Sequence, residues 1–152
     1  MKRLAPIIIL FLVILFLAGC AAPGGAGGDS ELDVVTSAYR EHAGSSQDRV
    51  VFPGLRAWRD LARDDIVVRT RLNDYFLLTL EPACASDLAF DSSLQLAIRQ
   101  QSRNTLSRFD TLRAGDTACR IQYIREVDHQ AVAAALEDMD IDEPFIRLDR
   151  DR

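Results

Sequence analysis

The sequence predicts a mainly β (α+β) domain, in which five to six antiparallel strands form a small curled sheet or a partly open barrel with a short helix at each end. Two observations predict this class. Short apolar segments separated by turn residues fill most of 50–128, whereas 31–44 and 129–138 have the character of helices. A chain of 152 residues is long enough for one such domain after its N-terminal segment is set aside.

The first 19 residues have the pattern of a signal peptide. Two basic residues precede Ile7–Leu17, an unbroken apolar run of eleven residues, which is the length of a signal-peptide core. Positions 17–20 read Leu-Ala-Gly-Cys and are similar to the lipobox of bacterial lipoproteins. That resemblance implies cleavage before Cys20 and attachment of acyl chains such as palmitate to this residue. The alternatives are an ordinary leader or an uncleaved membrane anchor, each with a chance cysteine, although a spanning helix needs about 20 apolar residues.

Residues 20–30 are predicted to be the lipidated Cys20 and a flexible tether of Gly, Ala and Pro, which have little to bury. Asp does not follow Cys20. Asp at that position is the usual inner-membrane retention signal of Gram-negative lipoproteins. The resemblance therefore implies a lipid-anchored protein on the periplasmic face of the outer membrane, with the inner membrane less favoured.

Cys84 and Cys119 are the two cysteines that remain after Cys20. In an oxidising compartment such a pair is expected to form a disulfide. The bond would close a loop of about 36 residues and stabilise the domain by about 4 kcal/mol in the chain-entropy model. Two free thiols or a metal pair are the alternative, which lacks support because only His42 and His129 could add imidazole ligands.

The two predicted helices differ in character. Apolar residues recur at helical spacing in 31–44, which predicts a short amphipathic helix that Gly44 ends. Residues 129–138 are rich in alanine, which favours a helix locally, and Asp128 is expected to cap it.

The first predicted strand contains Trp58, and the clearest hairpin follows it. Ile66–Leu72 and Tyr75–Leu80 are joined by Asn73-Asp74, and a two-residue turn there would place Val68 opposite Thr79. The apolar alternation in residues 94–101 suits a half-buried strand, and a helix is the alternative for this segment.

Two more strands are predicted near the end of the domain. Phe109–Leu112 is a short strand followed by a turn. The last strand alternates so that Cys119, Ile121 and Tyr123 share one face.

These elements carry a pattern that resembles a family of small, uncharacterised Gram-negative lipoproteins whose domain has no known function. The pattern is a strand with Trp, a hairpin ending in Leu-x-x-x-Cys, and a closing strand that begins Cys-x-Ile. The matching residues are Trp58, Ile66, Val67, Val68, Tyr75, Leu77, Leu80, Cys84, Leu88, Asp110, Cys119, Ile121 and Ile124. The resemblance covers roughly residues 54–127. It implies fold and location, and it brings no activity, substrate or catalytic residue.

The chain is mildly acidic, with 18 Lys and Arg against 23 Asp and Glu, and it has no basic run. Nucleic-acid binding is therefore not expected, because it requires concentrated positive charge. The nearest approach to a cationic patch comprises Arg56, Arg59, Arg63, Arg69 and Arg71. This set could face anionic head groups or a cell-wall polymer. Four aromatic residues are candidates for a ligand surface, although core packing is the commoner role: Trp58, Tyr75, Phe76 and Tyr123.

Residues 139–152 are predicted to be a disordered acidic tail. Asp138, Asp140 and Asp142 alternate as in a calcium loop, which makes them a weak metal candidate. The sixth place of that loop needs glycine and holds Glu143 instead. No metal or other cofactor is therefore expected.

The sequence contains no motif for nucleophilic or metal-dependent hydrolysis. We therefore expect a membrane-anchored periplasmic protein that is a non-enzymatic binding or structural module of the cell envelope. Its expected partners are the membrane, reached through the lipid, and another envelope protein or a cell-wall polymer. The alternatives are an enzyme that acts on envelope material and a cation-binding module that uses the acidic tail.

Overall fold

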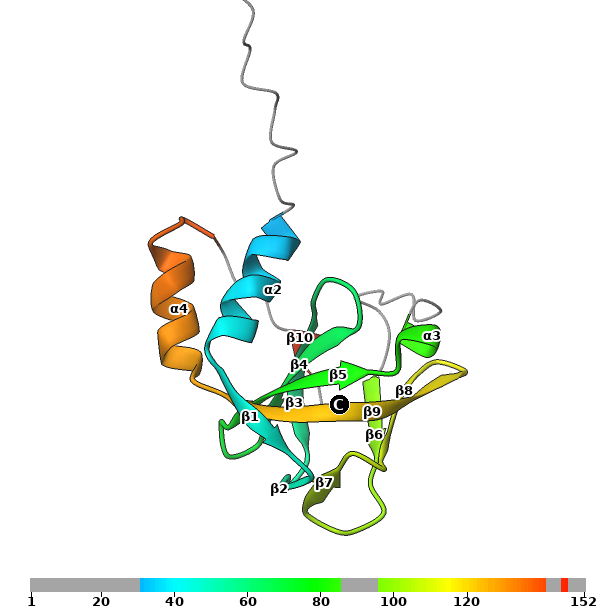
Figure 1. Ribbon diagram of the computed structural model, residues 1–152. Helices are drawn as coiled ribbons and strands as arrows, with labels where there is room; N and C mark the ends of the chain where they lie inside the picture. The colour runs from blue at the N-terminus through cyan, green and yellow to red at the C-terminus, as the bar shows by residue number, and fades with distance from the viewer. Residues whose placement is uncertain (1–30, 86–95, 142–145, 148–152) are drawn as a thin grey trace, which may run out of the picture.

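The computed structural model describes residues 31–85, 96–141 and 146–147 (Figure 1). The predicted leader, Cys20, the tether and Asp142 lie outside these residues. Within the described part, no helix has the length and apolar character needed to cross a membrane.

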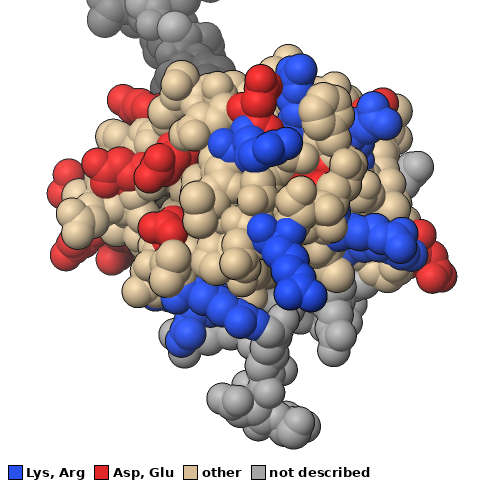
Figure 2. Space-filling model, turned by 90° about the horizontal axis from the view of Figure 1, so that it is seen from below, with Lys and Arg blue, Asp and Glu red and all other residues tan. Residues whose placement is uncertain are grey.

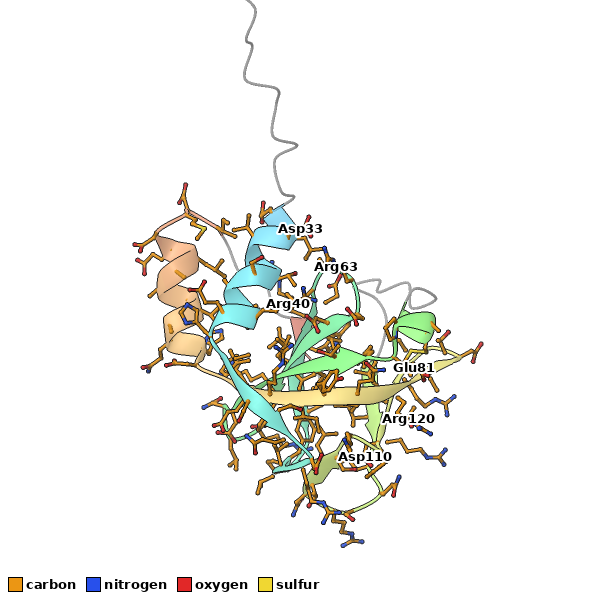
Figure 3. The ribbon with its side chains drawn as sticks, in the orientation of Figure 1. Asp33, Arg40, Arg63, Glu81, Asp110 and Arg120 are labelled. Carbon is orange, nitrogen blue, oxygen red and sulfur yellow. A yellow bond between two sulfur atoms is a disulfide. The ribbon has the colours of Figure 1, made fainter. Side chains whose placement is uncertain are left out.

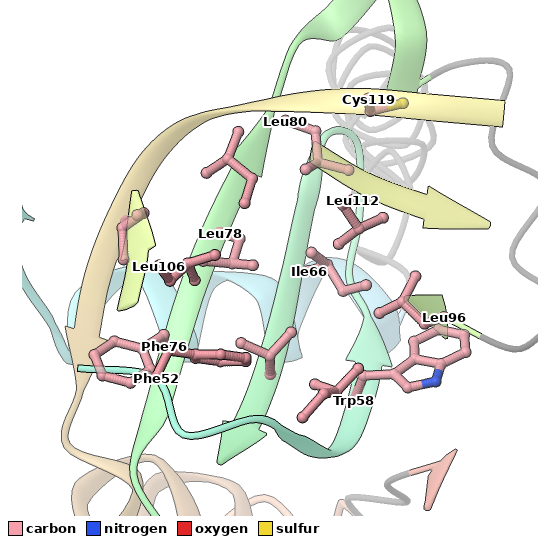
Figure 4. Close-up of a cluster of buried hydrophobic side chains, with 14 of the residues drawn as sticks. Phe52, Trp58, Ile66, Phe76, Leu78, Leu80, Leu96, Leu106, Leu112 and Cys119 are labelled. Atoms are coloured by element: carbon pink, nitrogen blue, oxygen red, sulfur yellow. The ribbon is translucent and has the colours of Figure 1, made fainter. Parts of the chain in front are cut away.

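The predicted fold class is confirmed. Six antiparallel strands curl into a nearly closed barrel in the order β3–β4–β5–β9–β8–β6. Their bounds are Leu55–Asp60 (β3), Asp65–Thr70 (β4), Tyr75–Leu80 (β5), Thr117–Val127 (β9), Thr111–Ala114 (β8) and Leu96–Arg99 (β6). The barrel nearly closes because β3 and β6 approach each other, and Trp58 of β3 lies beside Leu96 of β6 at this seam (Figure 4).

Four further strands extend this framework. β1 (Ala43–Gln47) and β8 pair with the same edge of β9. β8 pairs with the first part of β9 and β1 with its second half. At the other end of the sheet β10 (Ile146–Arg147) pairs with β3. A separate ribbon of β2 (Arg49–Val51) and β7 (Thr105–Ser107) lies at the bottom of the barrel in Figure 1.

Two helices lie side by side on the outside of the barrel, α2 (Glu31–Glu41) and α4 (His129–Glu137) (Figure 1). Their apolar side chains form a second core against Val67 of β4 and Leu77 of β5. Asp128 caps α4 as predicted, because its carboxylate accepts hydrogen bonds from the backbone N–H groups of Gln130 and Ala131. The helices therefore bury one outer face of the barrel wall.

The central hairpin is consequently buried on both faces. Ile66 and Phe76 point into the barrel, while Val67 and Leu77 point out toward the helices. A strand that is covered on both sides needs apolar residues at successive positions. This explains why apolar residues are continuous in these two strands, where one-sided burial would give strict alternation.

The predicted register of this hairpin is wrong. Val68 lies opposite Phe76 instead of Thr79, because the loop has four residues, Arg71–Asp74. The hydroxyl of Thr70 accepts hydrogen bonds from the backbone N–H groups of Leu72 and Asp74, and Asn73 adopts a φ of +69°. Side-chain bonding to the backbone thus stabilises the wider loop.

Other differences concern β9 and its neighbour β1. A bulge at Gln122 shifts the pairing with β5, so Tyr123 points outward instead of sharing the inner face with Ile121. β1 occupies residues that include the predicted helix end, and α2 already ends at Glu41. The segment 94–101, which suits a strand or a helix by sequence, is described from residue 96 on. Its residues Leu96–Arg99 form the strand β6.

A disulfide joins Cys84 of the short helix α3 (Pro82–Ala85) to Cys119 of β9, with the two Cα atoms 5.6 Å apart. Cys119 is fully buried in the barrel core. The bond therefore fixes the segment after β5 to the wall of the barrel.

We expect replacement of both Cys84 and Cys119 by alanine to lower the free energy of unfolding by about 4 kcal/mol, because the unfolded chain regains the entropy of the open loop. Urea denaturation of the oxidised protein and of the double variant measures the difference. Reduced wild-type protein is the control and should behave like the variant. Equal stability of all three forms would contradict the assignment of a stabilising cross-link.

Candidate functional site

An open polar pocket of about 410 Å³ lies between α2 and the outer face of the barrel. It forms where the helices no longer cover the strands, so polar side chains of several elements meet there. It is lined by Arg40 of α2, Ser46 of β1, Asp64 and Asp65 at the start of β4, Thr79 of β5, and Tyr123 and Arg125 of β9.

The floor of the pocket is organised by Asp65, whose carboxylate is buried. Its Oδ2 accepts a hydrogen bond of 2.6 Å from Nε of Arg40, and its Oδ1 accepts one of 2.6 Å from the hydroxyl of Thr79. Asp64 lies farther away, with 3.8 Å between its Oδ1 and Nη2 of Arg40. Asp65 therefore joins α2 to β4 and β5 and uses both of its oxygens to do so.

Arg125 is in a different position. Its Nη2 donates to the hydroxyl of Thr79 over 3.3 Å, and it makes no salt bridge with any described residue. Its Nε is buried and has no hydrogen-bond partner among the described residues. A guanidinium carries five N–H donors, so most of the hydrogen-bonding capacity of Arg125 is unused within the described structure.

The pocket wall adds an aromatic surface to this cation. Tyr123 is about half exposed, at 52%, and Ser46 is the cross-strand partner of Arg125 on β1. A half-buried guanidinium recognises a carboxylate or phosphate, and an exposed tyrosine offers a flat apolar face with a hydroxyl at its edge. The arrangement is suited to binding a small anionic group attached to a ring or an apolar chain.

The predicted arginine set does not form one patch. Arg63 and Arg71 lie in the turns at opposite ends of β4. Arg59 is buried on β3, where burial lowers its pKa and the charges of Asp60 and Glu31 partly oppose that shift. Arg69 lies over the ring of Tyr75, with 5.5 Å from its Cζ to the ring centroid.

The aromatic candidates also separate. Trp58 and Phe76 belong to the barrel core, Tyr75 packs against the second core, and only Tyr123 lines the pocket. Asp110, one of the residues of the family pattern, is buried at the base of the β7–β8 turn (Figure 3). Its carboxylate accepts hydrogen bonds from the backbone N–H groups of Gln101 and Ser107, which is a structural role.

His42 and His129 are far apart in the sequence, but the segments that contain them are neighbours in the structure. The carbonyl of His42 accepts a hydrogen bond from the N–H of Asp128, because β1 pairs with the end of β9. The ring of His129 stacks on Tyr75 with 3.8 Å between the centroids. Burial lowers the pKa of His129, the positive charge of Arg69 lowers it further, and Asp128 opposes both effects.

Two residues of the weak metal candidate, Asp138 and Asp140, follow α4 and are exposed. Over residues 31–85, 96–141 and 146–147, no group of three or more His, Cys, Asp or Glu side chains is arranged to hold a metal ion. A three-residue site with Asp142 stays a prediction, since that residue lies outside the described structure.

The main pocket residues, Arg40, Asp65, Thr79 and Arg125, were not recognised in the sequence. Asp65 follows Arg63 and Asp64, and such a run of charged residues is typical of a turn, although Asp65 begins an apolar strand. The sequence could have indicated a site here, because a carboxylate at the start of a strand that is buried on both faces needs a hydrogen-bonding or charged partner. The identity of that partner depends on the packing of α2, which the sequence does not specify.

A comparison with protein families decides the classification. The model of a family of unknown function, DUF6491, matches residues 1–142. The chain belongs to this family. No curated protein and no solved structure matches this DUF6491 member. Membership agrees with the expected resemblance to an uncharacterised family and assigns no activity.

We expect Asp65→Asn to lower the free energy of unfolding by about 2 to 3 kcal/mol, because it weakens two hydrogen bonds to a buried carboxylate. Asp64→Asn is the matched control and should cost less than about 0.5 kcal/mol, since its contact with Arg40 is long and partly exposed. Urea denaturation measures both values. Equal losses in the two variants would show that Asp65 does not organise the pocket.

The lowered pKa of His129 predicts a dependence of stability on pH. The unfolded chain binds a proton at the ordinary value of about 6.5, whereas the folded chain binds it only at lower pH. The free energy of unfolding should therefore fall as the pH drops below about 6.5. His129→Gln should reduce this fall, and His42→Gln is the control; urea denaturation between about pH 8 and pH 5 tests both. An unchanged pH profile in His129→Gln would contradict the assignment.

Proposed function

We propose that this protein is a lipid-anchored module of the Gram-negative envelope that binds an anionic ligand in the pocket beside Arg125 and performs no chemistry on it. The observation that carries the proposal is the state of Arg125, a half-buried cation in an open pocket that has no acidic partner among the described residues. Partial burial of a cation is unfavourable unless acceptors or an anion replace the water that it loses. A ligand that supplies the missing anion accounts for it.

The envelope location is supported by two separate features. The leader and lipobox before Cys20 suit lipidation at the periplasmic side of the inner membrane, followed by transfer to the outer membrane. The disulfide between Cys84 and Cys119 suits an oxidising compartment, in which such bonds persist.

Binding is favoured over catalysis by the state of the buried carboxylate. A general base must be free to take a proton from a substrate. Both oxygens of Asp65 are instead held by short hydrogen bonds from Arg40 and Thr79. Asp65 thus serves the fold, and Arg125 with Tyr123 serves the ligand.

Crosslinking in intact cells, followed by purification of the chain, tests the proposal. Arg125→Gln should reduce the yield of the crosslinked partner or polymer at least tenfold, because a charge-assisted pair with a carboxylate contributes about 1.5 to 3 kcal/mol. Arg120→Gln is the matched control, since Arg120 is exposed on the same strand and lies well away from Arg40 in Figure 3. It should leave the yield unchanged.

The anchor is tested in the same cells by labelling with palmitate. Label should be incorporated into the wild type and lost in Cys20→Ser. Label that persists in Cys20→Ser would refute lipidation at this residue. Equal crosslinking of wild type and Arg125→Gln would refute the binding site and leave the anchor unaffected.

A further inference from the structure

The bottom of the barrel carries exposed apolar side chains that the pocket does not explain. Val51 of β2 is 68% exposed, Leu72 of the β4–β5 loop is 64% exposed, and Phe109 after β7 is 59% exposed. Exposed apolar residues are common when scattered singly. Their meaning here depends on whether they lie on one surface.

Backbone hydrogen bonds connect the three segments. The N–H of Arg71 donates to the carbonyl of Gly54, which places the β4–β5 loop beside the chain that follows β2. The N–H of Arg108 donates to the carbonyl of Asp48, just before β2, which places the turn after β7 at its other end. These bonds place the β4–β5 loop and the turn after β7 beside opposite ends of the segment that contains β2.

Each of these three segments also carries an exposed arginine. Arg49 and Val51 both point away from the core, because Val50 between them is buried in it. Arg71 and Arg108 are exposed beside Leu72 and Phe109. We define the basic-apolar edge as Arg49, Val51, Arg71, Leu72, Arg108 and Phe109.

The charge on this edge is mainly positive. Asp48, which precedes Arg49, pairs with Arg108 over 3.3 Å while both side chains stay exposed. Cζ of Arg108 lies 5.4 Å from the ring centroid of Phe109, so the cation rests on the aromatic face. Figure 2 views the molecule from this end and shows arginine side chains spread across it, while acidic side chains gather mostly at the left margin, with others at the upper middle and the right margin.

Exposed apolar residues between arginines suit one kind of partner, the surface of an anionic bilayer. The apolar side chains enter the boundary between head groups and acyl chains, and the guanidinium groups pair with phosphates. Each Arg near an anionic surface strengthens binding about fivefold. A purely ionic partner would leave Val51, Leu72 and Phe109 in water.

We propose that the basic-apolar edge binds the surface of a bilayer that contains anionic phospholipid. β2 and β7, which lie beside the edge, are at the end of the barrel opposite the start of α2 (Figure 1). The bilayer that the edge contacts can therefore differ from the one that holds the N-terminal segment. None of the edge residues lines the pocket, so this inference does not depend on the proposed ligand site.

Capture of a second vesicle population tests the proposal with the full chain. The protein is reconstituted through its N-terminal segment into vesicles of phosphatidylcholine. It is then mixed with fluorescent vesicles that contain phosphatidylcholine alone or with phosphatidylglycerol. Wild-type protein should capture the vesicles with phosphatidylglycerol and fail to capture those with phosphatidylcholine alone.

Two triple variants separate the two contributions. Arg49→Gln with Arg71→Gln and Arg108→Gln should weaken capture about a hundredfold. Val51→Ser with Leu72→Ser and Phe109→Ser should also weaken it at least tenfold, because the lost side chains are apolar. Arg63→Gln and Met139→Ser are the controls, since both residues are exposed outside the edge. Circular dichroism verifies that each variant is folded.

The outcomes are distinct. Loss of capture in both triple variants, with unchanged controls, supports a bilayer surface. Loss in the arginine variant alone would overturn the proposal in favour of an anionic polymer, and an equal response to vesicles without phosphatidylglycerol would overturn the role of anionic lipid. No capture by wild-type protein would also overturn it. Arg125→Gln should capture vesicles normally, which keeps this result separate from failure of the ligand site.

Discussion

Burial of the β4–β5 hairpin on both of its faces is the constraint on which the rest of this structure depends. Each strand is only six residues long, yet it contributes side chains to the barrel core and to the core beneath the helices. Removal of the helices would expose Val67 and Leu77 to water, which is unfavourable in proportion to the apolar area uncovered. The barrel and the helices are therefore parts of one domain.

The outer face of the hairpin consists of three rows of cross-strand partners, and each row has a different role. Val67 and Leu77 form the middle row, on which α2 and α4 pack. Arg69 and Tyr75 form the row at the loop end, where Tyr75 stacks on His129.

Asp65 and Thr79 form the third row, at the end where the helices no longer cover the sheet. Asp65 can remain charged and buried there because Arg40 reaches it from α2. A buried carboxylate without such a partner would be strongly destabilising. The pocket thus lies where the apolar contact of the helices with Val67 and Leu77 ends and the polar contact between Arg40 and Asp65 begins.

The fold class could be predicted because it follows from local patterns. Apolar segments of strand length between turn residues indicated the barrel, alanine-rich residues after Asp128 indicated α4, and the pairing of Cys84 with Cys119 followed from counting cysteines. β1 could not be predicted, because its sequence Ala-Gly-Ser-Ser-Gln has no strand pattern. It is a strand because the edge of β9 offers it hydrogen bonds.

The hairpin register and the pocket were missed for related reasons. Thr70 at the end of β4 accepts hydrogen bonds from the N–H groups of Leu72 and Asp74, and Asn73 adopts a positive φ, which favours a loop of four residues over the expected two. The pocket combines residues from α2, β1, β4, β5 and β9, and their meeting point depends on this register. A site built from several strands cannot be predicted when the strand register is uncertain by even one residue, because such a shift changes which side chains lie opposite each other and on which face.

The bulge at Gln122 has the largest effect on the candidate site. In an unbroken strand that begins with Cys119 and Ile121 inside the barrel, Tyr123 and Arg125 would also point inward and Ile124 would point outward. Arg125 would then be a cation inside an apolar core, which is not tolerated without a partner. One inserted residue reverses this pattern, so Ile124 completes the core while Tyr123 and Arg125 reach the outer face. The pocket exists because the bulge reverses which side chains of β9 point outward in its second half. A β9 with strict alternation would have a more regular sequence pattern and would place neither Tyr123 nor Arg125 in the pocket.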